Sequence, residues 1–341
     1  AYENKLPWLD HIEFPSQSTC ATKFSVNLKP RSLVAIGGGK DSMVSIEMLK
    51  GLSEDICLFM VGQSAFIKSV AKTTSLPLLQ VKRKVDPRLT EANNKGAYNG
   101  HIPITAINSC VAVVAALIAD FDSVIFSNER SADVGNLKDQ EGRWVNHQYS
   151  KSFEFEKAWQ AIIQSDLAVD LNYFSLLRPF SELAIVKKFA HLKQYFSVFS
   201  SCNRNFHLSG SLNKDNHWCG ECPKCAFVYL CLAPFIPKDE LLLIFKKNLF
   251  EDKRLSHLFA ALLGIEGQKP FECVGDEQEC RQALRMVSEH KDWCQDEDIN
   301  NWLKQISDLN LIEDDGIFKL KQLHQIPNKR NFMKALQYEF K

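Results

Sequence analysis

The chain has little of what marks membrane proteins or proteins that bind nucleic acids. Lysine and arginine together number 41, and so do aspartate and glutamate, so the formal net charge is zero. A protein that grips a phosphate backbone usually carries a basic surplus, and we therefore expect no nucleic-acid partner. The longest apolar run, which begins at Cys110, is shorter than the ~20 residues of a membrane-spanning helix. We therefore expect no membrane partner.

The sequence also lacks an internal repeat, a low-complexity tract and a basic segment followed by an apolar one near its start. It does contain eleven cysteines. Without a secretion signal, these cysteines indicate a reducing compartment, the cytoplasm, and metal or thiol chemistry rather than disulfides. A content of 45% hydrophobic and 24% charged residues is ordinary for an enzyme of one large or two modest domains.

Apolar runs and helical periodicity divide the chain into three parts. Residues 1–30 are polar, and we expect them to form a cover or the remnant of an upstream domain. Residues 31–237 alternate strands with helices, which predicts right-handed βαβ units and an α/β fold with a mostly parallel, doubly wound sheet. The predicted strands are 32–36, 56–61, 76–81, 123–127 and 173–177, and the predicted helices are 42–50, 66–74, 106–119, 153–166 and 181–192.

Within the second part, residues 82–103 and 128–148 are polar and predict long loops, which in a compact domain are often functional. The third part, residues 238–341, carries apolar residues at helical spacing over 238–250, 255–263, 278–290 and 299–309. They predict a C-terminal helical appendage.

A glycine-rich turn between the first strand and the first helix carries the clearest chemistry. Gly37, Gly38 and Gly39 follow the apolar strand, and Lys40, Asp41 and Ser42 open the helix. Glycines let the backbone approach an anion closely, and the helix N-terminus adds free amide donors and partial positive charge. Lys40 supplies a full charge, and Asp41 and Ser42 can cap the helix or help to hold Mg²⁺. The turn predicts a phosphate cradle, against the alternative of an ordinary glycine turn.

This turn is neither a Walker A loop nor a dinucleotide fingerprint, because its spacing is too compact for either. It resembles the PP-loop of the ATP pyrophosphatase superfamily, whose members have a HUP-like fold and split ATP between the α- and β-phosphates. Gly37 stands where that superfamily usually has its first serine. The resemblance implies that Gly37, Gly38, Gly39, Lys40, Asp41 and Ser42 bind ATP.

Three cysteines at positions 219, 222 and 225 form two overlapping C-x-x-C steps, which predict a metal knuckle. Tetrahedral Zn²⁺ takes four sulfur or nitrogen ligands. We expect Cys202 to be the fourth, with His217 and His207 as alternatives. Structural zinc is the leading interpretation of Cys202, Cys219, Cys222 and Cys225. A redox or sulfur-relay role and an iron–sulfur cluster are the alternatives.

Several runs together resemble the MurL family, the UDP-N-acetyl-α-D-muramoyl-L-alanyl-L-glutamate epimerases of some bacteria. These runs are residues 36–42, 100–106, 126–132, 147–152, 177–182, 200–204 and 218–225. The resemblance extends from about residue 31 to the stretch 271–275. The related 7-cyano-7-deazaguanine synthases also pair a PP-loop with a cysteine knuckle, but their first cysteine spacing is shorter.

The resemblance implies a substrate and a reaction. The substrate is a peptidoglycan precursor that ends in L-Ala-L-Glu, and the product carries D-Glu. ATP converts the terminal α-carboxylate into an acyl adenylate. The neutral acyl group makes the neighbouring Cα–H acidic enough for a modest base to remove its proton. AMP and pyrophosphate are released, and Mg²⁺ neutralises the developing charge.

Roles for further residues follow as hypotheses. Arg130 or Arg178 would pair with the substrate glutamate or a phosphate, and Glu129 would bind Mg²⁺ or the ribose. Asn128 and Glu129 follow a predicted strand end, where ligands bind in such sheets. The alternatives are an Arg130–Glu129 surface ion pair and an Arg178 that hydrogen-bonds a strand end.

The acid–base groups are the least specified part of the site. We expect His101 and His147, which titrate near neutral pH, to join Lys40 and Asp41 as catalytic residues, although a structural or substrate-binding role is open for each. Three other functions also remain open: a PP-loop ligase or synthetase, a tRNA sulfurtransferase and a nucleotide sensor without chemistry. The intact Lys40, Asp41 and Ser42 argue against the sensor.

Overall fold

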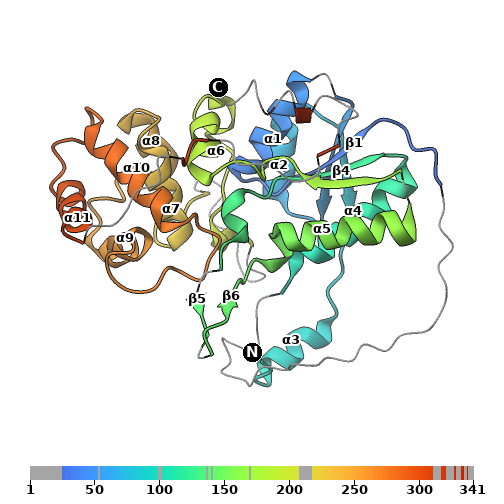
Figure 1. Ribbon diagram of the computed structural model, residues 1–341, viewed down its shortest axis with the longest axis horizontal. Coiled ribbons are helices and arrows are strands. Elements are labelled where there is room, and N and C mark those ends of the chain that lie inside the picture. The colour runs from blue at the N-terminus through green and yellow to red at the C-terminus, as the bar shows by residue number, and fades with distance from the viewer. Residues whose placement is uncertain are drawn as a thin grey trace.

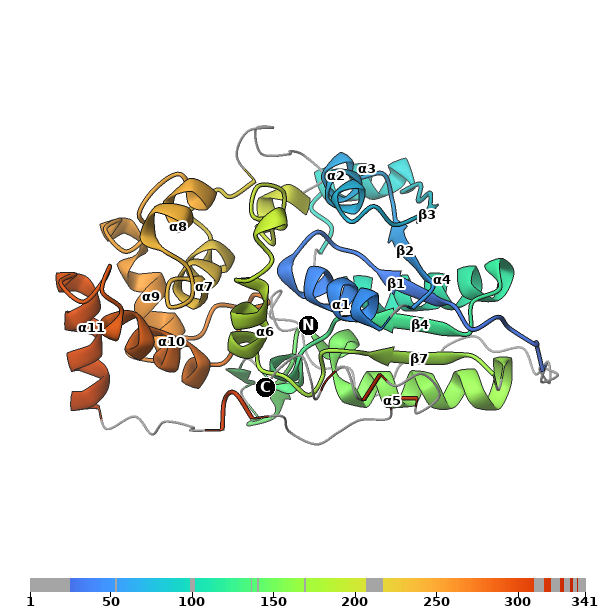
Figure 2. The same ribbon diagram turned by 90° about the horizontal axis from the view of Figure 1, so that it is seen from above.

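The computed structural model describes residues 25–309, except for 53, 99–101, 136, 140, 169 and 207–216, and beyond them 316–319, 326–327, 332–333 and 336. Its centre is a five-stranded parallel sheet (Figure 1), with the strands in the order β3-β2-β1-β4-β7 (Figure 2). The strands are β1 (Ser32–Ala35), β2 (Ile56–Val61), β3 (Leu78–Val81), β4 (Ser123–Phe126) and β7 (Asn172–Ser175). The prediction of an α/β fold around a parallel sheet is confirmed.

Helices cover both faces of this sheet. Alternate side chains of each strand enter two different hydrophobic clusters, as the two-residue period of a strand requires. Val34 and Leu58 pack with α1 (Lys40–Gly51) and α2 (Ala65–Thr73). Leu33 and Phe59 pack with α4 (Ile104–Ala119), and the same cluster reaches α5 (Phe153–Ile162) and its π-helical extension, Ile163–Leu167. The sheet is therefore doubly wound.

Two segments predicted as loops contain regular structure. Helix α3 (Pro87–Asn94) begins after Asp86, whose side chain accepts a hydrogen bond from the Arg88 amide, but it buries none of its residues. Because nothing on it is buried, the sequence shows no apolar period there. The hairpin of β5 (Leu137–Lys138) and β6 (Trp144–Val145) has strands too short to form a pattern. Its turn is held by Asp139, which accepts hydrogen bonds from two main-chain amides.

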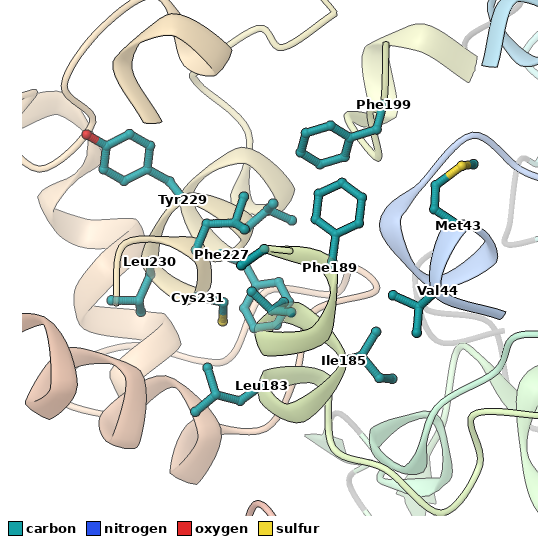
Figure 3. Packing of buried hydrophobic residues seen from close by; sticks show 14 of the residues in the cluster. Met43, Val44, Leu183, Ile185, Phe189, Phe199, Phe227, Tyr229, Leu230 and Cys231 are labelled. Carbon is teal, nitrogen blue, oxygen red and sulfur yellow. The ribbon is translucent and has the colours of Figure 1, made fainter. Parts of the chain in front are cut away.

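The C-terminal helices pack onto the sheet layer through one shared core. They are α7 (Pro223–Leu232), α8 (Lys238–Phe245), α9 (Ser256–Leu263), α10 (Glu277–Glu289) and α11 (Glu297–Asp308). Helix α6 (Glu182–Phe189) lies between α1 on one side and α7 on the other (Figures 2 and 3). Side chains of all three enter the same hydrophobic cluster. The predicted appendage is therefore helical, but it shares its hydrophobic core with the sheet.

Helix α7 was missed at the sequence level because its residues are buried all round and because its start overlaps the cysteine knuckle, with Cys222 as the N-cap residue and Cys225 in the first turn. None of the helices in the described part of the chain combines the length and the hydropathy needed to span a bilayer.

Candidate functional site

The chain reverses its direction of winding between β1 and β4, and the candidate site lies at this point. The chain proceeds from β1 to β2 and β3 on one side, and from β4 to β7 on the other. In open α/β sheets, ligands bind beyond the carboxyl ends of the strands at such a switch point. The segments that leave β1, β4 and β7 there are residues 36–39, 127–129 and 176–181.

The glycine turn has the backbone geometry of an anion site. Gly38 has a φ of +85°, and a Cβ added there would lie 2.5 Å from the Phe66 ring, so a larger residue would be strained. A Cβ on Gly37 would meet nothing within 4 Å. Gly39 is the N-cap residue of α1, and no side chain caps the helix there in the described structure. The first amides of α1 are thus open to an anionic ligand.

Lys40, the first residue of α1, is buried in an ionic cluster. Its Nζ donates to Asp41 Oδ1 at 2.5 Å and also to Glu182 Oε2. The side chains of Lys40 and Glu182 are only 3% and 2% exposed. Burial lowers the pKa of Lys40, but the two carboxylates outweigh burial, so its pKa is raised and the ammonium stays charged.

Glu182 completes this cluster at the first position of α6. The hydroxyl of Ser181 caps α6 by accepting a hydrogen bond from the Ala184 amide. Burial raises the pKa of Glu182, and the Lys40 ammonium opposes that rise. Sequence reasoning did not assign Glu182 a role. Its available signal was a glutamate just after a helix cap, close behind the last strand of the sheet.

Three carboxylates meet at this point. One oxygen each of Asp41, Glu129 and Glu182 lie within 4.8 Å of one another. Glu129 and Glu182 are buried, and Asp41 is partly exposed. Hard divalent cations such as Mg²⁺ take carboxylate oxygens as ligands. The donor set therefore suits such a cation. Sequence reasoning had placed Asp41 and Glu129 near Mg²⁺, and the fold brings both together with Glu182.

The predicted substrate-binding residues surround the cluster, but each is engaged within the protein. Asn128 donates to the Ser175 hydroxyl at 2.9 Å. Arg130 donates to the carbonyls of Ile317 and Lys319, both at 3.3 Å. This pairing differs from the alternative of an ion pair with Glu129.

Arg178 is buried and joins several segments. It donates to the Glu129 carbonyl at 3.0 Å, to the Lys151 carbonyl at 2.6 Å and to the Glu156 carboxylate at 3.0 Å. The bond to the Glu129 carbonyl, just beyond the end of β4, agrees with the alternative that Arg178 hydrogen-bonds a strand end. The substrate-binding roles of Asn128, Glu129, Arg130 and Arg178 stay predictions.

The four cysteines of the predicted knuckle lie together. All four Sγ atoms are within 4.8 Å of one another, with distances of 3.5 Å for Cys222–Cys225, 3.7 Å for Cys219–Cys225 and 4.0 Å for Cys202–Cys222. Tetrahedral Zn²⁺ with bonds of about 2.3 Å would separate its sulfur ligands by about 3.8 Å. The four thiols therefore fit such an ion.

Of the two alternative ligands, His217 is not part of the group that the four thiols form. The imidazole of His217 stacks near the Phe66 ring, with 5.3 Å between centroids. His207 lies outside the described residues.

A short segment connects the cysteine cluster to the glycine turn. The amide of Ser200 donates to the Gly38 carbonyl at 3.0 Å, and the Ser200 hydroxyl accepts from the Cys202 amide at 3.0 Å. The same hydroxyl donates to the His217 carbonyl at 2.6 Å. The segments that carry the cysteines thus support the backbone of the turn.

Of the two predicted acid–base histidines, His101 lies outside the described residues. The His147 ring stacks near Phe271, with 4.6 Å between centroids. Burial, followed by the charge of nearby lysines, lowers the pKa of His147 to about 4, so its imidazole is neutral at neutral pH. Its Nε2 lies 3.9 Å from Cys273 Sγ, which is itself 3.4 Å from Lys151 Nζ. Sequence reasoning had given no decisive role to Lys151 and none to Cys273.

The fold and these residues define an α/β protein with a buried ionic cluster at the switch point of a parallel sheet. Residues 1–176 match the MurL N-terminal domain, and residues 198–315 match the MurL C-terminal domain. The chain belongs to the MurL family, as its motifs had indicated.

Three relatives extend this finding, and each is named UDP-N-acetyl-alpha-D-muramoyl-L-alanyl-L-glutamate epimerase. The chain is 43% identical over 331 residues to the protein from Xanthomonas oryzae pv. oryzae, covering 96% of this chain and 73% of that protein. It is 40% identical to the proteins from a Micromonospora species and Salinispora tropica, over 295 and 296 residues. Those two matches cover 86% of this chain and 65% and 64% of the relatives, so the chain spans just under two thirds of their length.

Proposed function

We propose that this chain epimerises the terminal glutamate of UDP-N-acetyl-α-D-muramoyl-L-alanyl-L-glutamate, a step in peptidoglycan-precursor synthesis. The observation that carries the proposal is the 43% identity, over 96% of the chain, to a protein named for that reaction. The polar site at the sheet's switch point supports it, because this is where α/β enzymes bind their ligands.

The chemistry requires that the substrate be activated. A Cα–H beside a carboxylate is a very weak acid, because its carbanion would lie next to a negative charge. We infer that an oxygen of the terminal α-carboxylate attacks the α-phosphorus of ATP. The bond from that phosphorus to the oxygen that bridges the α- and β-phosphates breaks, and pyrophosphate leaves. The resulting acyl adenylate loses its Cα proton, regains one on the opposite face and is hydrolysed to the epimer and AMP.

The glycine turn supports the ATP half of this scheme. The open space at Gly37 and the uncapped amides of α1 suit the phosphates. The Lys40 ammonium lies at the same end of α1 and can stabilise the departing charge. Asp41, Glu129 and Glu182 would hold Mg²⁺, which supplies charge neutralisation when bound.

For the cysteine cluster we propose structural Zn²⁺ bound by Cys202, Cys219, Cys222 and Cys225. A closed four-thiolate site leaves no position for a reacting water, which favours a structural role. The contact of Ser200 with Gly38 suggests what that role is, because it joins the cysteine segment to the glycine turn.

One assay tests the proposed function. The chain is incubated in deuterated water with ATP, Mg²⁺ and the UDP-linked L-Ala-L-Glu precursor, and AMP, pyrophosphate, Cα deuterium and D-glutamate are measured. We expect all four signals with this precursor, and we expect none of them with the precursor that ends at L-Ala. Formation of ADP, or of AMP without Cα exchange, would contradict the scheme. AMP release that depends on ammonia would indicate a ligase instead.

A further inference from the structure

Three ionisable side chains gather beside the carboxylate cluster without a role in the scheme so far. The Sγ of Cys273 lies 3.4 Å from Lys151 Nζ and 3.9 Å from His147 Nε2. Cys273 is partly exposed. The Lys151 ammonium also interacts electrostatically with Glu129 and Asp41. The thiol, the imidazole and the carboxylates therefore belong to one continuous ionic site.

The fold holds the thiol in place from two sides. Cys273 lies in the segment between α9 and α10, and the Lys224 ammonium donates to its carbonyl. Gly275 packs so tightly that an added Cβ would lie 2.8 Å from both Phe227 and Glu279. On the other side, Arg178 binds the carbonyls of both Lys151 and Glu129. The buried Arg178 guanidinium thus fixes the main chain at Lys151, which carries the ammonium, and at Glu129, which carries a carboxylate.

The charge states of the neighbours leave the sulfur as the suitable base. Burial lowers the pKa of Lys151, but Cys273 and Glu129 outweigh burial, so its pKa is raised and the amine stays protonated. The pKa of His147 is lowered to about 4, which makes it a poor base. The Cys273 sulfur lies 3.4 Å from the Lys151 ammonium, whose positive charge would pair with the negative charge of a thiolate.

Resting on the proposed function, we propose that the Cys273 thiolate is the catalytic base that removes the Cα proton of the activated glutamate. The Cα–H bond breaks, its electron pair moves onto the acyl carbonyl oxygen as an enolate, and the proton goes to Sγ. A water-derived proton then adds to Cα on the opposite face, and the thiol returns its proton to solvent. Lys151 is a positioning residue that holds the thiolate.

The test separates proton transfer from adenylation. Cys273→Ser and Cys273→Ala are assayed in deuterated water for AMP formation and for Cα deuterium exchange. General bases typically contribute 10²–10⁴-fold, so we expect Cα exchange to fall about 100-fold or more while AMP formation stays within a few-fold of the wild type. Cys294→Ser, which changes a partly exposed thiol in the same helical region, is the matched control and keeps both activities.

The outcomes distinguish this inference from the function on which it rests. If the wild type shows no Cα exchange, the proposed function fails. If the wild type exchanges and the Cys273 variants exchange equally fast, the base assignment fails. A substrate-derived acyl group found on Cys273 by mass spectrometry would also overturn it, because the sulfur would then be a nucleophile.

A second measurement covers variants that fail to fold. The folded wild type is treated with iodoacetamide, and the labelled cysteine is located by peptide mapping. We expect labelling of Cys273 to abolish Cα exchange but not AMP formation, and bound precursor to slow the labelling. Full exchange by a protein alkylated at Cys273 would refute the proposal.

Discussion

Replacing Lys40 with methionine should destabilise the fold strongly. The Lys40 and Glu182 side chains are 3% and 2% exposed, so the change leaves a buried carboxylate without its counter-charge. Removing one partner of a buried ion pair typically costs about 3–5 kcal/mol. Asp41 is 28% exposed, so water solvates part of its charge, and we expect the lower end of that range. In a chain of this size each kcal/mol corresponds to roughly 2 °C in the melting temperature.

The measurement is urea or thermal unfolding of Lys40→Met, Glu182→Gln and the double variant. Because Lys40 and Glu182 contact each other directly, their effects should not add, and the double variant should be less destabilised than the sum of the two single changes. Lys50→Met is the matched control. Lys50 lies in the same helix and pairs with Glu47 at 2.9 Å, but this pair is partly exposed, so the loss should stay within about 1 kcal/mol.

The pH dependence of the variant gives a second check. The Lys40 ammonium opposes the rise in the pKa of Glu182, so removing it raises that pKa further above the unfolded value. A carboxyl group with a raised folded-state pKa favours folding at low pH and loses that contribution as the pH rises. The difference in the free energy of unfolding between the wild type and Lys40→Met should therefore be smaller near about pH 5 than near about pH 8. A pH-independent deficit, or one below about 1 kcal/mol, would refute the argument from buried charge.

Two further predictions follow from the glycine turn and the cysteine cluster. Gly38→Ala should lower the free energy of unfolding by about 1–3 kcal/mol and weaken ATP binding, because φ is +85° and the added Cβ would meet Phe66. The control is Gly142→Ala, which is also at positive φ but in open space. Equal ATP affinities in the two variants would contradict the reasoning. The purified chain should carry roughly one zinc ion by elemental analysis, and Cys222→Ser should lose it and bind ATP more weakly, whereas Cys110→Ser should do neither. A metal-free wild type with full ATP affinity would refute this coupling.

The centre of the sheet could be predicted because β1, β2 and β4 are buried on both faces and contain apolar runs. The run predicted at 56–61 coincides with β2, and the other strands agree within a few residues. Helix α3 could not be predicted because it buries none of its residues, and the β5–β6 hairpin could not be predicted because each of its strands has only two residues. Helix α7 was hidden for the opposite reason, since it is buried on every side.

The site was predictable only where one short segment carries the chemistry. The turn from Gly37 to Ser42 and the spacing of the cysteines at 219, 222 and 225 are local patterns, and both predicted a ligand before any fold was known. Glu182 and Cys273 lie in stretches that resemble the family, 177–182 and 271–275, but no local pattern there indicates a chemical role for either residue. Glu182 joins the site through its contact with Lys40, which is 142 positions away in the sequence. Cys273 does so through its contact with Lys151, which is 122 positions away. Such pairings depend on how α6 and the segment before α10 pack.

Glu182 lies between the two stretches that match the MurL domains, which end at residue 176 and resume at residue 198. An N-terminal fragment cut at residue 176 would keep Lys40, Asp41 and Glu129 but would lack the carboxylate that completes their cluster. A C-terminal fragment that starts at residue 198 would keep α7 but would lack α6, one of the helices that α7 packs against. The two halves named by homology are therefore unsuited to separate expression, and a dissection of this enzyme should treat the short connector as a third, indispensable piece.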